Sequence, residues 1–162
     1  MNREEKQSRL SLEYFKKGYA LQLDGHLDKA ANYFKKSIQC KASAEAYTYL
    51  GWIYSQKGFY ETAIRYCRKA IKINPDYGNP YNDIGAYLIQ LKQYDEAVSW
   101  LKKALEAPKY NNYCYPLFNL AYIFEVKGDW KKALKYLEKS IIENPDYKAA
   151  RTAIDRLRGK FN

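Results

Sequence analysis

The sequence predicts an all-α protein, an α-solenoid of four helical hairpins followed by one capping helix. Three observations lead to this prediction. A pattern of large, small and aromatic residues returns with a period of 34 residues, glycine marks most of the hairpin turns, and the segment after the last copy carries its apolar residues on one side of a helix. Because the pattern covers nearly the whole chain, we expect a single domain over residues 1–162.

The four copies of the pattern span residues 11–43, 44–77, 78–113 and 114–147. Each copy has a small residue in its first half and an alanine in its second half, such as Gly51 and Ala63 in the second copy. Small residues that face each other let two helix axes approach closely. Each copy therefore predicts two helices, A and then B, that pack as a hairpin. Residues 3–10 are expected to extend the first helix A backward.

The predicted turns between helix A and helix B contain Gly25, Gly58 and Gly128 in three of the copies. Glycine adopts the left-handed backbone of such a turn without steric cost. The third copy has Lys92 at this place, and we expect its turn to be less favourable. A stack of hairpins leaves its last apolar face open, and we expect a capping helix over residues 148–158 to cover it.

The spacing of these residues resembles the tetratricopeptide repeat. The resemblance implies a right-handed superhelix in which helix A of each copy lines a concave groove for a peptide or a partner protein. The groove residues that it implies are Tyr19, Tyr49, Trp52, Asn82, Asp83, Phe118, Asn119 and Tyr122. Tyrosine and tryptophan are enriched in binding hot spots, and asparagine can pair with a peptide backbone. The sequence leaves open the alternative that these aromatic residues only fill space between repeats.

Basic residues recur on helix B, the side that the resemblance makes convex. The chain has 28 Lys and Arg against 18 Asp and Glu, a net charge of +10. The expected convex stripe consists of Lys35, Lys36, Arg68, Lys69, Lys102 and Lys103. Such a stripe could bind an acidic protein surface or the phosphates of RNA. The interpretation that the sequence favours is a solvated helix face.

Three further features lie between residues 74 and 147, namely the segments 81–88 and 94–97 and the two-residue insert before Asn119. In these features the region resembles the repeats of type IV pilus assembly lipoproteins, the pilotin family. This resemblance implies a factor for pilus or secretion assembly. Pilotins begin with a lipoprotein signal and a cysteine, which the sequence lacks, so the resemblance does not extend to membrane attachment.

No catalytic residue, metal site or cofactor is predicted. His26 is expected in an exposed turn, and the sequence has neither a glycine-rich phosphate loop nor the spacing of zinc ligands. It has no apolar run of about 18 residues for a membrane span and no secretory signal at its start, so we expect a cytoplasmic protein. The predicted function is a non-catalytic adaptor or scaffold that binds a peptide or partner protein. The alternatives are RNA binding, pilus or secretion assembly, and self-association.

Overall fold

Helices make up all the regular structure in the part of the chain that the computed structural model describes, residues 2–160. Nine helices and no strand occur there, which confirms the prediction of an all-α helical repeat solenoid. The chain divides after Pro80 into two units, and each unit is built from hairpins of consecutive helices.

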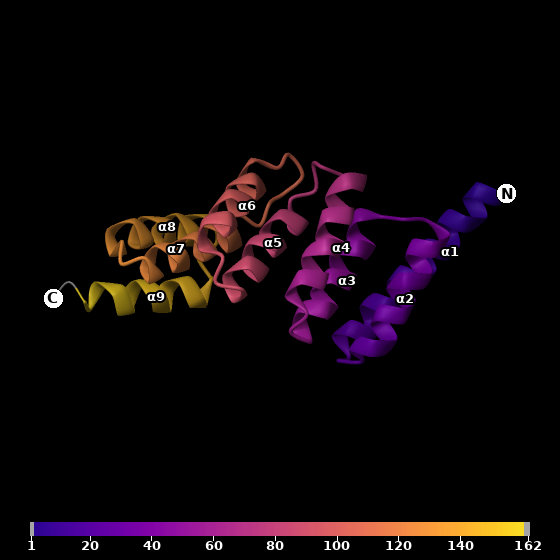
Figure 1. The fold of residues 1–162 in the computed structure, drawn as a ribbon, viewed down its shortest axis with the longest axis horizontal. Coiled ribbons are helices and arrows are strands. Elements are labelled where there is room, and N and C mark those ends of the chain that lie inside the picture. The colour runs from indigo at the N-terminus through magenta and orange to yellow at the C-terminus, as the bar shows by residue number, and fades with distance from the viewer. Residues whose placement is uncertain (1, 161–162) are drawn as a thin grey trace. The chain divides into compact units, whose positions relative to one another are not determined.

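The first unit contains two antiparallel hairpins (Figure 1). Its helices are α1 (Arg3–Leu23), α2 (Leu27–Cys40), α3 (Ala44–Gln56) and α4 (Tyr60–Ile73). Helix α1 includes the predicted backward extension, and a capping box stabilises its first turn. There the side chain of Asn2 accepts a hydrogen bond from the Glu5 backbone N–H, and the Glu5 carboxylate accepts one from the Asn2 backbone N–H, both at 2.8 Å.

The second unit contains two further hairpins and the terminal helix. Its helices are α5 (Asn79–Gln90), α6 (Tyr94–Glu106), α7 (Cys114–Val126), α8 (Trp130–Glu143) and α9 (Lys148–Arg158). Helix α9 has a strongly one-sided distribution of apolar residues, and that side is buried against α7 and α8. Ile154 and Leu157 of α9 lie in one cluster with Ala121 and Leu137, so α9 covers the apolar face that the last hairpin would otherwise expose.

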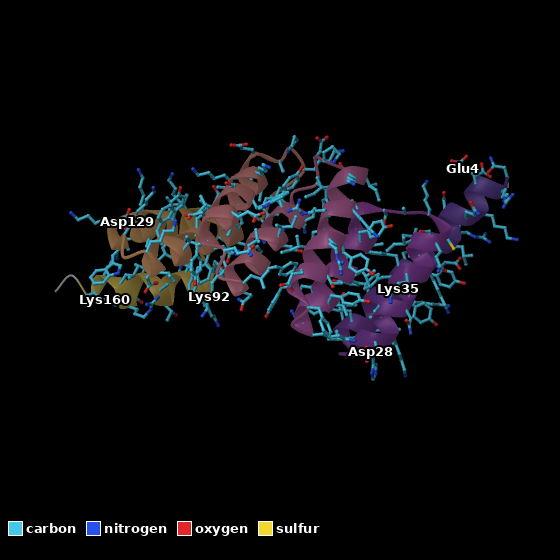
Figure 2. All side chains as sticks on the ribbon, viewed as in Figure 1. Glu4, Asp28, Lys35, Lys92, Asp129 and Lys160 are labelled. Carbon is cyan, nitrogen blue, oxygen red and sulfur yellow. The ribbon has the colours of Figure 1, made fainter. Side chains whose placement is uncertain are left out.

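The turns between paired helices have the left-handed backbone that the sequence predicts. The φ angles are 78° at Gly25, 80° at Gly58 and 79° at Gly128. Lys92, which is labelled in Figure 2, lies in the turn between α5 and α6. Its φ is 59°, and among the described residues it is the one residue other than glycine with a positive φ. A Cβ atom makes this conformation unfavourable, as expected for the third copy.

Small residues hold the helices of a hairpin close together. A Cβ atom added to Gly51 would lie 3.0 Å from the carbonyl oxygen of Ala63, and one added to Gly85 would lie 2.5 Å from Leu101. The alanines that face these glycines, Ala63 and Ala97, are fully buried. The contact between small residues that the repeat pattern predicts is therefore present in both units.

Candidate functional site

The first candidate surface lies where α1 and α3 meet. This α1/α3 face carries Leu12, Phe15, Tyr19, Glu45, Tyr49 and Trp52. Tyr49 is its centre, because its ring lies 5.5 Å from the rings of Phe15, Tyr19 and Phe34. Trp52 is half-buried against the same apolar cluster. Tyr49 and Trp52 therefore join the two hairpins, whereas Leu12 is 53% and Tyr19 40% exposed.

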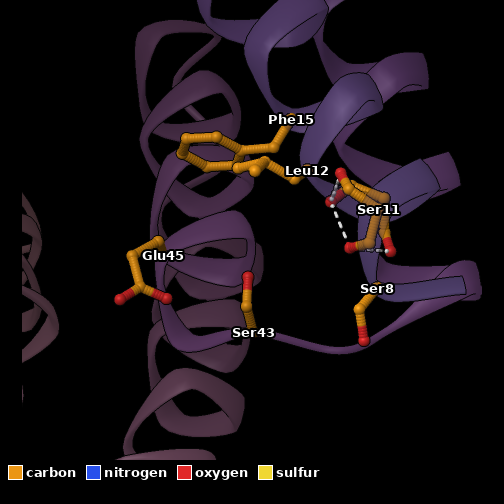
Figure 3. Close-up of a pocket in the computed structure, with 7 residues that line it drawn as sticks. Ser8, Ser11, Leu12, Phe15, Ser43 and Glu45 are labelled. Carbon is orange, nitrogen blue, oxygen red and sulfur yellow. Dashed lines mark hydrogen bonds between the residues drawn. The ribbon is translucent and has the colours of Figure 1, made fainter. Parts of the chain in front are cut away.

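A hollow of about 220 Å³ opens beside Leu12 (Figure 3). We call it the serine hollow, and it is lined by Ser8, Ser11, Leu12, Phe15, Ser37, Ser43 and Glu45. The Ser11 hydroxyl donates to the carbonyl oxygen of Ser37, and the Ser37 hydroxyl donates to the carbonyl oxygen of Ser11, both at 2.9 Å. The Ser43 hydroxyl oxygen caps α3 by accepting the Ala46 N–H at 3.1 Å.

These bonds satisfy the buried polar groups of the serine hollow within the protein. Its remaining surface is mainly apolar and is formed largely by Leu12 and Phe15, which lie on one side in Figure 3. The exposed carboxylate of Glu45 lies at its edge. The serine hollow can therefore accept an apolar group and leave no buried hydroxyl without a partner.

The second candidate surface is the α5/α7 face, which carries Asn82, Asp83, Tyr115, Asn119 and Tyr122. The Asn119 Nδ2 donates to the Asn82 Oδ1 at 3.2 Å. Burial raises the pKa of the neighbouring Asp83 carboxyl to about 7, although a hydrogen bond with the Asn82 side chain opposes this shift. The structure thus brings together three of the predicted groove residues, and Tyr122 stands 45% exposed on the same helix as Asn119.

Ion pairs join the C-terminal end of α7 to α9 and the residues that follow it. The Arg156 guanidinium donates two hydrogen bonds to the Glu125 carboxylate, one of them at 2.8 Å, and the Lys160 ammonium lies 3.8 Å from it. The bond from Arg156 holds the pKa of Glu125 below its usual value. Phe118 of α7 packs edge-on against Tyr147 just before α9, with ring centroids 5.3 Å apart. Phe118, one of the predicted groove residues, is thus half-buried in this contact.

The predicted basic stripe occupies exposed positions on α2, α4 and α6, but four of its lysines lie over aromatic rings. The ammonium group of Lys35 lies 5.8 Å from the ring centroid of Tyr54 (Lys35 is labelled in Figure 2), and that of Lys103 lies 4.5 Å from the ring of Trp100. Lys36 and Lys69 each lie within 6 Å of two tyrosine rings. Cation–π contacts of this kind stabilise the helix faces themselves.

Sequence reasoning missed the serine hollow and the contacts between lysines and rings. Leu12, Phe15 and Glu45 occupy groove positions of the repeat, so the pattern contained part of the signal for the hollow. The reciprocal bonds between Ser11 and Ser37 join residues from two helices, and no local spacing reveals them.

Other kinds of site have no support in the described residues. Residues 2–160 contain no group of three or more His, Cys, Asp or Glu side chains placed to hold a metal ion. Across the same residues, no helix has both the length and the apolar character of a membrane span. His26 lies exposed at the start of α2, as expected.

Comparisons with known proteins agree with the repeat pattern. Models of the tetratricopeptide repeat match residues 14–42, 44–77, 66–99 and 114–147. The uncharacterized protein ycf37 of Guillardia theta is 30% identical over 132 residues, which cover 78% of this chain and 73% of that protein.

Two solved structures show the same fold. PilF of Pseudomonas aeruginosa matches with a TM-score of 0.88 at 21% identity, over 96% of this chain and 70% of that one. YrrB, described as a TPR protein with an unusual peptide-binding site, matches with a TM-score of 0.70 at 21% identity, over 88% of this chain and 73% of that one.

Proposed function

The chain belongs to the tetratricopeptide repeat family of protein–protein interaction modules, and from this premise we propose that it binds a peptide segment of a partner protein. The proposed binding surfaces are the α1/α3 face and the α5/α7 face, which are formed by the first helices of the hairpins. The observation that carries the proposal is the serine hollow, because it places an exposed leucine beside an open apolar space.

The serine hollow fits one apolar side chain of a peptide. Its volume of about 220 Å³ has room for a side chain the size of leucine, and Leu12 and Phe15 would bury their exposed surface against it. Full burial of such a side chain contributes about 1.5–3 kcal/mol. The carboxylate of Glu45 at the edge favours a peptide with a basic residue next to the apolar one.

The α5/α7 face is a separate binding surface in the second unit and would bind the backbone of a peptide there. The Asn119 side chain donates to Asn82 through its nitrogen, and its amide oxygen can accept a peptide N–H. A desolvated peptide amide needs such a partner, since an unpaired one costs about 1–3 kcal/mol. Tyr122 offers a large and exposed contact area beside this amide pair.

Selection of peptides from a random display library on the full chain, followed by affinity measurement by fluorescence anisotropy, tests this proposal. Leu12→Lys should lower the affinity for the selected peptide by about tenfold or more, because the variant loses the apolar wall of the serine hollow. Leu23→Lys is the matched control, because Leu23 is 68% exposed on the same helix and lies about 16 Å further along its axis.

The control variant Leu23→Lys should bind the selected peptide with an affinity within about twofold of that of wild type. The proposal predicts in addition that Asn119→Ala weakens binding of peptides at the α5/α7 face, while the helical circular dichroism stays unchanged. Peptides that bind wild type, Leu12→Lys and Asn119→Ala with equal affinity would refute binding at both faces.

A further inference from the structure

We propose that the outer face of α8 binds an acidic segment of a partner protein that carries an apolar residue close to its carboxylates. This surface belongs to the second unit and involves other residues than the peptide binding proposed above. It consists of two hollows that share the side chain of Lys139.

The first hollow, which we call the lysine hollow, has a volume of about 420 Å³. It is lined by Asp129, Lys131, Lys132, Lys135, Tyr136 and Lys139. Three of these lysines follow one another at intervals of four residues, so they lie in one row along the helix. Lysines so placed repel one another, and an acidic occupant would relieve that repulsion.

The charge of the lysine hollow is not neutralised within the described chain. None of its four lysines pairs with a carboxylate of a described residue. The carboxylate of Asp129 is engaged at the start of α8, where it accepts the Lys132 backbone N–H at 3.1 Å (Asp129 is labelled in Figure 2). Four ammonium groups against one carboxylate leave a net charge of +3 around the hollow.

Aromatic rings hold two of the lysines in place. The Lys132 ammonium lies 4.2 Å from the ring centroid of Phe124, and the Lys139 ammonium lies 5.8 Å from that of Tyr136. These two rings stack on each other with centroids 5.5 Å apart and planes 1° from parallel. The two lysines are thus positioned before an acidic partner arrives, which lowers the entropy lost on binding.

The second hollow is mainly apolar, although Lys139 and Glu143 belong to its lining, and it lies next along α8. It has a volume of about 420 Å³, and its lining consists of Leu105, Tyr113, Leu117, Lys139, Ile142 and Glu143. Ile142 is 76% exposed, more than any other large apolar side chain in the described residues. From Lys135 to Ile142 the helix rises about 10 Å, which an extended peptide spans with about three residues.

The pair of hollows therefore favours a peptide over RNA. Phosphates could pair with the lysines, but the apolar hollow at Ile142 suits an aliphatic or aromatic side chain. Complementarity of charge selects carboxylates for the lysine hollow, and the short distance between the hollows limits the spacer to a few residues.

The test uses the full chain and a fluorescein-labelled peptide of four glutamates, two glycines and a leucine, with binding measured by fluorescence anisotropy at low and at physiological salt. Lys131→Gln combined with Lys135→Gln should weaken binding by about tenfold, because each exposed ion pair contributes up to about 1 kcal/mol. Ile142→Ser should weaken binding without changing its dependence on salt. Lys6→Gln combined with Lys17→Gln removes the same charge from exposed positions of α1 and should leave the affinity unchanged.

Lys135→Glu separates binding from folding. It replaces lysine repulsion with attraction to Lys131 and Lys139, so its melting temperature should equal or exceed that of wild type while peptide binding is lost. The proposal is overturned if the peptide does not bind at low salt. It is overturned as well if the α1 control lowers the affinity for the peptide as much as Lys131→Gln combined with Lys135→Gln does. It is also overturned if a single-stranded RNA of equal charge binds as tightly and Ile142→Ser has no effect on the peptide.

Discussion

Replacement of Lys92 by glycine is expected to stabilise the protein. Lys92 occupies the turn between α5 and α6 with a φ of 59°, where the other three turns have glycine with φ of 78° to 80°. The side chain of Lys92 is exposed, and the backbone N–H donates to the carbonyl oxygen of Ile89 at 2.9 Å. Glycine keeps that backbone bond, so in the folded state Lys92→Gly removes only the strain due to the Cβ atom.

The size of the effect follows from two opposing contributions. A left-handed backbone costs a residue with a Cβ atom about 1–2 kcal/mol. Glycine gains conformational entropy in the unfolded chain, which offsets about 0.5–1 kcal/mol of that difference. The net stabilisation by Lys92→Gly is therefore about 0.5–1 kcal/mol, or a rise of about 1–4 °C in melting temperature.

Urea denaturation followed by circular dichroism measures this change in the full chain. The reciprocal variant Gly58→Lys is the matched comparison, because Gly58 has a φ of 80° and a Cβ atom there would meet no atom within 4 Å. It should lower stability by about the amount that Lys92→Gly raises it. If both variants shift the unfolding curve in the same direction, backbone strain at this turn is not the cause.

Three further variants test packing and charge. Gly85→Ala should destabilise the protein by roughly 1–3 kcal/mol in urea, because its Cβ atom would lie 2.5 Å from Leu101. Arg156→Ala should cost up to about 1 kcal/mol near neutral pH. Since Arg156 lowers the folded pKa of Glu125, that loss should be present above the ordinary carboxyl pKa of 4.5 and disappear in acid. The folded pKa of Asp83 is raised to about 7 from 3.8, so its carboxyl binds a proton in the folded state that the unfolded chain has released. Stability should therefore fall as the pH rises from about 4 to 7, and Asp83→Asn should remove this slope in thermal melts.

The aromatic residues show how far the candidate site could be predicted. The repeat pattern identifies Tyr49, Trp52 and Tyr122 as residues of helix A, but it does not tell how deeply each one is buried. In the structure, Tyr49 packs between rings of two helices, whereas Tyr122 remains 45% exposed. The burial of a side chain depends on the size of every neighbour across the helix interface. A periodic pattern indicates only the side of the helix on which a residue lies.

The basic residues show the same limit. Their spacing on helix B indicates exposure, and Lys35 and Lys69 are exposed. Their positions over tyrosine rings depend on side chains of other helices, such as Tyr54 and Tyr47 of α3. Side-chain rotamers at such contacts are set by tertiary packing rather than by the residue's own helix.

The sequence alone determined the order of helices, the turns at glycine and the close pairing at small residues. These features depend on backbone preferences and helical periodicity, which act over a few residues. Only the tertiary structure decided which polar atoms meet across helices, as with the reciprocal bonds of Ser11 and Ser37 and the amide pair of Asn82 and Asn119. A hydrogen bond needs its donor and acceptor atoms within about 3 Å of each other. For residues on separate helices, the packing of whole side chains sets that distance.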